Sequence, residues 1–224
     1  MPTKTLSEIR ASVRTLGNYE NSARATDAYL TEWINSAISE YHEFVIDSWE
    51  GYYDKVDETI VTSAGEQEVD LPEDFLRLRL LQRKLGTDSY TPLDRVTLVD
   101  ASRYGGRGTP RGYSLFGSDS DPMPGMIRLW PVPDGTYTLR VTYVPVASVL
   151  AEDGDEYMFL PGGDKFVICQ TLVELDERGG RDTTARLMQV ERAKVRIKAS
   201  AKQRDTAEPE YLFPRSYSRS EEFD

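Results

Sequence analysis

The side chains that most often form catalytic or metal sites are scarce in this sequence. His42 is the only histidine and Cys169 the only cysteine among 224 residues. A single cysteine excludes an intrachain disulfide and a cysteine-rich zinc site. Nucleophilic catalysis by serine and histidine would require His42, which stands between Tyr41 and Glu43 in an acidic, helix-forming stretch. We therefore expect His42 to lie on the surface or at a helix interface, and Cys169 to lie in the core.

Acidic residues cluster at two places that suggest a calcium loop. One holds Asp119 and Asp121, and the other holds Asp153, Asp155 and Glu156. Neither matches the twelve-residue pattern of oxygen ligands with a central glycine and a closing glutamate, so we expect solvated loops at both. Hydrolysis by a pair of carboxylates stays open, because 38 acidic residues always offer some pair and nothing singles one out.

A glycine-rich loop, Gly105-Gly106-Arg107-Gly108, has the composition of a phosphate cradle. It lacks the Gly-Lys-Ser/Thr ending of a P-loop and does not match G-x-G-x-x-G, so a flexible connection is the better interpretation. We predict no catalytic, cofactor-binding or metal-binding residues and no enzymatic activity.

The charge of the chain is acidic and unevenly distributed. The net charge is −11 and the pI about 4.7, which argues against a DNA-binding surface, because such a surface needs Lys and Arg to displace counterions. Residues 181–204 nevertheless carry eight basic and two acidic side chains, whereas residues 26–50 carry six acidic ones and no lysine or arginine. These two segments attract each other if they pack within or between subunits, although two unrelated solvated faces are the alternative. The predicted interface residues in the basic segment are Arg192, Lys194, Arg196 and Lys198.

The elements that position these residues belong to an α+β fold with four parts. We predict a helical bundle at 1–56, an inserted antiparallel β lobe at 57–150, a helical part that completes the bundle at 151–204, and an extended C-terminal tail at 205–224. No apolar run is long enough to span a membrane or to act as a signal peptide, so we expect a chain made in the cytoplasm and no membrane contact.

Capping signals bound the N-terminal helices. Thr5 and Glu8 form a capping box, and Gly17 ends the first helix. Thr26 or Asp27 caps a longer second helix with an apolar face at helical spacing.

The C-terminal helical part has two helices. Asp164 caps the first, which stops at Gly179-Gly180, and Asp182 begins the second, which continues to about Arg204. The narrow apolar stripe of this last helix contains Leu187, Val190, Ile197 and Ala201.

Between these helical parts the apolar period changes to that of strands. Residues 60–62 and 66–71 predict a hairpin with Gly65 in its turn. The remaining elements are strands at 76–85, 112–116, 126–130 and 136–144, and a short helix within 95–104.

The tail carries more aromatic residues than a solvated linker does. We expect it to fold onto a partner and predict interface residues at Tyr211, Leu212, Phe213 and Tyr217.

Several short motifs follow one another between residues 26 and 210. In chain order they are Trp33-Ile34-Asn35-Ser36-Ala37, Leu71-Pro72-Glu73-Asp74-Phe75-Leu76-Arg77-Leu78, Arg103-Tyr104-Gly105, Pro110 with Tyr113, Ile127-Arg128-Leu129-Trp130-Pro131-Val132-Pro133, Tyr137-Thr138-Leu139-Arg140-Val141-Thr142-Tyr143 and Arg204-Asp205-Thr206-Ala207-Glu208-Pro209. Each motif alone has low specificity. Their order resembles the head-to-tail adaptor, or connector, proteins of tailed bacteriophages, the group that includes the tail tubular protein A type.

The resemblance implies a virion structural protein located in the neck between capsid and tail. It implies a homo-oligomeric ring, typically of twelve subunits, that binds the portal protein and is followed by a tail nozzle or other tail protein. It implies no cofactor and no reaction, and DNA would pass through the lumen without specific binding. The tail would bind the portal or a neighbouring subunit, and the β lobe would lie outward or toward the tail of the particle.

Three alternatives stay open at this point. The first is another neck or tail completion protein, and the second is a virion-associated hydrolase that uses acidic residues. The third is a glycan-binding module, in which Trp130 and nearby tyrosines form a stacking platform on the β lobe.

Overall fold

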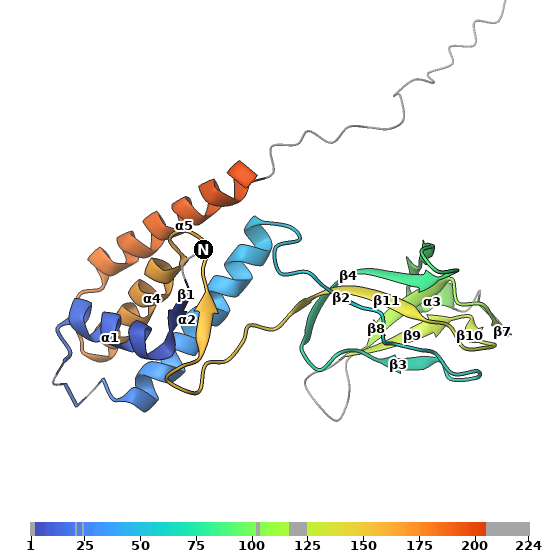
Figure 1. The fold of residues 1–224 in the computed structure, drawn as a ribbon, viewed down its shortest axis with the longest axis horizontal. Coiled ribbons are helices and arrows are strands. Elements are labelled where there is room, and N and C mark those ends of the chain that lie inside the picture. The colour runs from blue at the N-terminus through green and yellow to red at the C-terminus, as the bar shows by residue number, and fades with distance from the viewer. Residues whose placement is uncertain (1–2, 21, 24, 102–103, 117–124, 205–224) are drawn as a thin grey trace, which may run out of the picture.

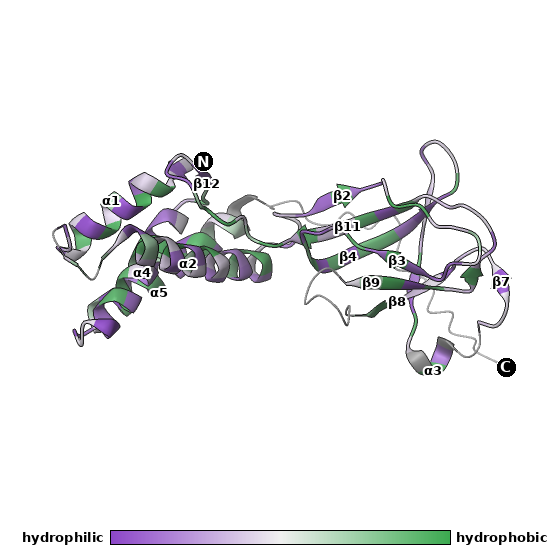
Figure 2. Ribbon diagram, turned by 90° about the horizontal axis from the view of Figure 1, so that it is seen from below, coloured by the Kyte–Doolittle hydropathy of each residue, from purple (hydrophilic) through white to green (hydrophobic). Residues whose placement is uncertain are grey.

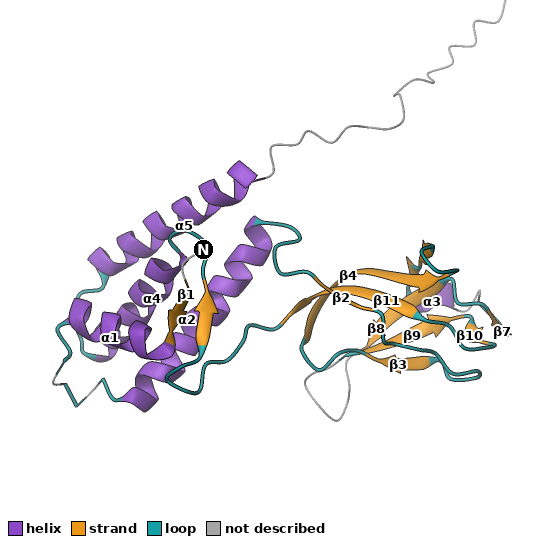
Figure 3. Cartoon of the chain, viewed as in Figure 1, coloured by secondary structure: helices purple, strands orange, loops and turns teal. Residues whose placement is uncertain are grey.

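Buried apolar side chains form two separate cores, one among helices and one between sheets. The computed structural model describes residues 3–20, 22–23, 25–101, 104–116 and 125–204. Figure 1 shows the helical body and the β lobe side by side, and Figure 3 shows that they differ in secondary structure. The predicted α+β class, with helices on both sides of a β lobe in the sequence, is confirmed. The tail lies outside the described residues.

The helical body is built from helices of both chain halves and one short ribbon. Its elements are β1 (Thr3–Thr5), α1 (Leu6–Gly17), α2 (Asp27–Ser48), β12 (Glu156–Met158), α4 (Gly163–Arg178) and α5 (Thr184–Arg204). Strand β1 pairs antiparallel with β12, so the start of the chain is joined to the segment that returns from the β lobe. Helix α4 packs against α1, α2 and α5.

Local capping sets the limits of α1 and α2, as predicted. The Thr5 hydroxyl accepts a hydrogen bond from the Glu8 amide, and the Glu8 carboxylate accepts one from the Thr5 amide. Thr26 caps α2. Gly17 ends α1 in a crowded place, where a Cβ would lie 2.4 Å from the Tyr19 ring and 2.7 Å from Leu172.

Two predictions for the C-terminal helices are wrong in detail. Gly162 is the N-cap of α4, and Asp164 lies in its first turn, where the carboxylate forms an ion pair with Lys4 at 3.3 Å. Leu187 is 46% exposed and does not belong to the buried stripe of α5. The buried residues of that stripe are Val190, Ala193, Ile197 and Ala201.

The β lobe consists of two four-stranded sheets that pack face to face. One sheet has the order β2-β11-β4-β5, with β2 (Lys55–Asp57), β11 (Leu139–Pro145), β4 (Phe75–Lys84) and β5 (Tyr90–Pro92). The other has the order β3-β9-β8-β6, with β3 (Glu68–Asp70), β9 (Met126–Trp130), β8 (Gly112–Phe116) and β6 (Asp94–Arg95). Figure 2 shows the two sheets as layers. Leu81, Leu139 and Val141 of the first sheet share the core with Ile127 and Leu129 of the second.

Most of the pairing is antiparallel, with two short exceptions. Strand β6 runs parallel to β8, and β7 (Arg107–Gly108) runs parallel to β10 (Val132–Pro133). The short helix α3 (Leu98–Ala101) falls within the predicted range.

The predicted hairpin around Gly65 is wrong. Gly65 has a left-handed φ of +88°, as a turn residue would. The two flanking segments, however, pair with different partners, because Val61 bridges to Thr138 and β3 pairs with β9. The chain crosses here from one sheet to the other, and alternation of apolar residues indicates a strand without indicating its neighbour.

Candidate functional site

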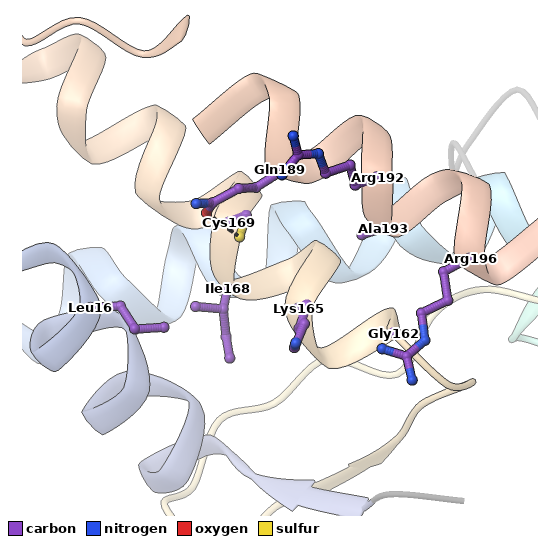
Figure 4. A pocket seen from close by; sticks show the side chains of 9 residues that line it. All are labelled: Leu16, Gly162, Lys165, Ile168, Cys169, Gln189, Arg192, Ala193 and Arg196. Atoms are coloured by element: carbon purple, nitrogen blue, oxygen red, sulfur yellow. Dashed lines mark hydrogen bonds between the residues drawn. The ribbon is translucent and has the colours of Figure 1, made fainter. Parts of the chain in front are cut away.

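A cavity of about 420 Å³ lies between α4 and α5, next to the end of α1. We call it the α4/α5 cavity (Figure 4). Its apolar lining comes from Leu16, Ile168, Cys169 and Ala193, and its cationic lining from Lys165, Arg192 and Arg196. Gly162 and Gln189 complete it.

Helical spacing aligns these side chains. Lys165, Ile168 and Cys169 recur at intervals of three and four residues and therefore share one face of α4. On α5, Arg192 and Arg196 lie four residues apart, and both are exposed side chains at the rim of the cavity. The cavity is thus the seam between two helices of the same body.

Gly162 brings the chain close to Arg196. Its φ is +94°, and a Cβ at this position would lie 3.1 Å from Cδ of Arg196. The missing side chain lets the aliphatic part of Arg196 rest over the start of α4, which leaves the guanidinium at the mouth of the cavity (Figure 4).

The Cys169 thiol is a core group, as predicted, and also faces the cavity. It donates a hydrogen bond to Oε1 of Gln189 at 3.4 Å. Burial raises the pKa of the thiol, with Arg186 and Lys165 opposing this shift. The neutral thiol is a poor nucleophile near neutral pH.

The four predicted interface residues of α5 point in different directions. Arg192 and Arg196 line the α4/α5 cavity. Lys194 forms an ion pair with Glu191 at 2.8 Å, and the Lys198 ammonium lies 5.3 Å from the centre of the Phe44 ring on α2. Within the described part of the chain, no ion pair joins α2 to α5, so salt bridges of that kind do not hold the acidic and basic helices together there.

Helix α5 also exposes apolar side chains on the side opposite its buried stripe. Met188 is 58% exposed and Val195 is 69% exposed. Both share a helix face with Arg192, because the three residues are spaced by four and three. Composition and charge did not single out these positions, although their seven-residue spacing was visible in the sequence.

A second cavity, of about 500 Å³, lies where the helical body meets the β lobe. His42, Tyr53, Lys55, Asp74 and Pro145 contribute to its lining. His42 lies 4.2 Å from Tyr53, ring centre to ring centre, and its Nε2 bonds to the carbonyl of Pro145. His42 is therefore a buried interface residue, consistent with one of the two predicted placements, and its ring bonds to backbone rather than to a hydroxyl nucleophile.

Two charged groups of this second cavity, Lys55 and Asp74, neutralise each other. Lys55 pairs with the Asp74 carboxylate at 2.7 Å, and the Tyr143 hydroxyl donates to the other oxygen of Asp74, also at 2.7 Å. The hydrogen bond from Lys55 is the largest cause of a lowered pKa at Asp74.

The acidic loop at 153–156 has a structural role. Asp153 forms an ion pair with Arg10, which also donates to the Thr31 hydroxyl. The Asp155 carboxylate accepts from the amides of Glu152 and Ala151, and these hydrogen bonds lower its pKa. The described residues contain no group of three or more His, Cys, Asp or Glu side chains suited to a metal ion. Asp119 and Asp121 lie outside them.

Some of the remaining candidate positions lie within the described residues and others lie outside them. Trp130 is half-buried, and its indole nitrogen donates to the Ser114 hydroxyl at 2.7 Å. Tyr211, Leu212, Phe213 and Tyr217 lie outside the described residues. Lys165 and Gln189 of the α4/α5 cavity were missed, although Lys165 stands one turn before Cys169 on the same helix face.

The comparisons with known proteins identify the family. None of the described helices combines the length and apolar character that crossing a membrane requires. No curated protein matches the chain. The family model described as SU10 adaptor protein matches residues 4–208, which include both the helical body and the β lobe. The chain therefore belongs to the SU10 adaptor protein family.

Proposed function

We propose that this bacteriophage adaptor is a structural protein without enzymatic activity. It forms a ring under the portal and links the capsid to the tail while DNA passes through its lumen. The number of subunits we propose is twelve, as the resemblance to head-to-tail adaptors implies. The observation that carries the proposal is the outer face of α5, an edge helix of the body that exposes Met188 and Val195 beside Arg192 (Figure 1). Exposed apolar residues flanked by charge are typical of protein interfaces.

The opposite charges of α2 and α5 suit contacts between neighbouring subunits. Glu32, Glu40 and Glu43 are exposed on α2. Burial and the nearby Glu174 raise the pKa of Glu40 against the opposing effect of Lys194 in the same subunit, so a further cation from another subunit would stabilise this acidic cluster. Arg196 and Lys198 supply such cations from α5 of the next subunit in the ring.

The net charge suits a DNA channel. Twelve copies with a net charge of −11 each carry about −132 charges, and like charge weakens adhesion of DNA to the lumen. Passage without specific binding follows from this repulsion.

We assign the two partners of the ring, the portal protein and the tail protein, to different parts of the chain. We place the portal protein at the tail, where Tyr211, Leu212, Phe213 and Tyr217 are aromatic and apolar anchors on an acidic segment. The β lobe faces the tail nozzle or another tail protein. These contacts put the protein in the neck of the virion after synthesis in the host cytoplasm.

The interface is tested by charge reversal on α5. In a variant with Arg192, Lys194, Arg196 and Lys198 changed to Glu, we expect loss of ring assembly in native mass spectrometry with and without portal. A second set of changes, Glu32, Glu40 and Glu43 to Lys, should restore part of the assembly. Arg95→Glu with Arg111→Glu, on the exposed surface of the β lobe, is the control and should assemble normally. Normal rings from the α5 variant would refute the interface.

The portal contact is tested by ending the chain after Arg204. The truncated protein should retain the circular dichroism and monomer mass of a folded subunit but lose attachment to portal particles. Normal attachment would exclude the tail as the portal anchor. If electron microscopy located the subunits at another level of the neck, the protein would be a different neck or tail completion protein.

A further inference from the structure

The α4/α5 cavity combines an apolar floor with three positive charges that lack partners. Lys165, Arg192 and Arg196 line it from two helices; all three are exposed, and none of them forms an ion pair with the described residues. Among the described residues, no carboxylate lines the cavity. Three cations around one cavity attract an anionic ligand.

The same chain contains a segment with complementary chemistry. Residues 205–224 include six acidic and two basic side chains. Glu210 directly precedes Tyr211, Leu212 and Phe213, and Glu208 lies two residues before Glu210. The two carboxylates and three large apolar side chains of this segment are complementary to the cations and the apolar floor of the cavity.

We propose that in the free subunit residues 208–213 fold back along α5 and bind in the α4/α5 cavity of the same chain. Tyr211 and Phe213 would contact the floor formed by Ile168 and Ala193, and the two glutamates would pair with Arg192 and Arg196. The aromatic side chains would then be covered until a partner competes for them.

The geometry of α5 places the cavity within reach of this segment. An α-helix rises about 1.5 Å per residue, so Arg196 lies about 12 Å and Arg192 about 18 Å from Arg204 along the axis. An extended chain spans at most about 3.3 Å per residue, so the seven residues 205–211 reach about 23 Å. Tyr211 can therefore reach both arginines of its own subunit after the chain reverses direction.

The tether favours the same chain over a second copy. A short flexible linker gives an effective concentration on the order of millimolar, which exceeds micromolar concentrations of free subunit. Binding in the cavity and binding to a partner exclude each other, so an engaged partner must release the cavity. The covering of residues 208–213 in the free subunit goes beyond the proposed adaptor function, and it can be tested without the portal protein.

Photocrosslinking of the free monomer tests the proposal. A photoreactive phenylalanine analogue at position 213 should crosslink within the chain to peptides of α4 and α5, with a yield independent of dilution. In a mixture of heavy-isotope and ordinary chains, the crosslinks should join peptides of equal isotope content. Mixed-isotope crosslinks would indicate a second copy and overturn the proposal, as would crosslinks that avoid α4 and α5.

Charge reversal gives a matched control for this experiment. Arg192→Glu with Arg196→Glu should lower the crosslink yield several-fold. Lys194→Glu lies on the same helix but outside the cavity and should leave the yield unchanged. Equal effects of both variants would show that general attraction to α5, rather than the cavity, holds the segment.

Cys169 provides an independent readout because it is the only cysteine and lines the cavity. Its reaction with a disulfide reagent should be several-fold faster in a chain that ends after Arg204. Tyr211→Ala with Phe213→Ala in the full chain should give the same increase, whereas Tyr217→Ala with Phe223→Ala should not. Identical rates in all four proteins would contradict the docking. Failure of portal attachment would not affect either experiment, so the two proposals can fail separately.

Discussion

The Nε2 atom of His42 lies 2.9 Å from the carbonyl oxygen of Pro145. His42 belongs to α2 of the helical body, and Pro145 is the last residue of β11. A carbonyl oxygen only accepts hydrogen bonds, so Nε2 carries the proton and donates. The other ring nitrogen is buried without a hydrogen-bond partner among the described residues. The neutral imidazole thus joins the helical body to the β lobe at the point where the chain leaves β11.

This contact predicts a pH dependence of stability. Burial lowers the pKa of His42, opposed by its bond to Pro145 and by Glu43, while the nearby Lys55 and Asp74 pair with each other. Because the folded pKa lies below the unfolded value of about 6.5, the unfolded state binds the proton more readily. The stability contribution is complete above pH 6.5 and is lost as the pH falls through the folded pKa. Urea unfolding at pH 7.5 and 5.5 should show this loss.

His42→Gln isolates the effect, since no other histidine titrates in this range. The difference in unfolding free energy between pH 7.5 and 5.5 should be smaller in the variant than in the parent protein. Carboxylates, including Glu40 with its raised pKa, are common to both proteins and cancel in the comparison. An unchanged pH dependence would assign it to another group.

Gly163→Ala should destabilise the helical body. A Cβ at this position would lie 2.6 to 2.7 Å from the ring and hydroxyl of Tyr41. Tyr41 is fully buried, and its hydroxyl accepts a hydrogen bond from the Leu160 amide at 2.8 Å, so the ring has little freedom to move. We expect a loss of about 1–3 kcal/mol, the usual cost of overpacking, despite the better helix propensity of alanine. Thermal and urea unfolding measure it.

Gly135→Ala is the matched control, because nothing lies within 4 Å of a Cβ there. It should change the unfolding free energy by about 0.5 kcal/mol or less, as surface substitutions usually do. A similar loss in both variants would mean that the contact with Tyr41 is not the cause.

Because the two cores are separate, we predict that a cavity-creating substitution in one core destabilises that part of the protein and leaves the other part unchanged. Leu172 and Leu139 are both fully buried, one in each core. Leu→Ala changes at such positions cost about 2–5 kcal/mol. Leu139→Ala should speed amide hydrogen exchange in β4 and β11 and leave α4 protected, and Leu172→Ala should do the reverse. Equal acceleration in both lobes would show that they unfold as one unit.

The Asp176 carboxylate should contribute more to the free energy of unfolding than the Tyr19 hydroxyl that donates a hydrogen bond to it. Its carboxylate accepts from the Tyr19 hydroxyl at 2.7 Å and lies 3.7 and 3.6 Å from the guanidinium groups of Arg181 and Arg186. We expect Asp176→Ala to cost about 1.5–3 kcal/mol and Tyr19→Phe about 1 kcal/mol, because bonds to charged groups are stronger. Urea unfolding of the two single variants and the double variant measures the coupling. A larger loss for Tyr19→Phe would reverse this ranking.

The sequence by itself determined where the two N-terminal helices begin and which stretches are strands. Thr5 with Glu8 and Thr26 mark helix starts through hydrogen bonds that span three residues, so neighbouring sequence contains the whole signal. The strands predicted at 112–116 and 126–130 coincide with β8 and β9 for the same reason, since alternation is a local property. The basic character of α5 was equally visible.

Only the tertiary structure decided which segments meet. The stretch around Gly65 formed a sheet-to-sheet crossing rather than a hairpin, because β3 pairs with β9 in one sheet while Val61 bridges to Thr138 beside the other. Likewise, four similar cations on α5 acquired different surroundings once α4 packed beside them. Arg192 and Arg196 line the α4/α5 cavity with Lys165, while Lys194 and Lys198 do not, because the packing of two helices fixes which side chains border the seam between them.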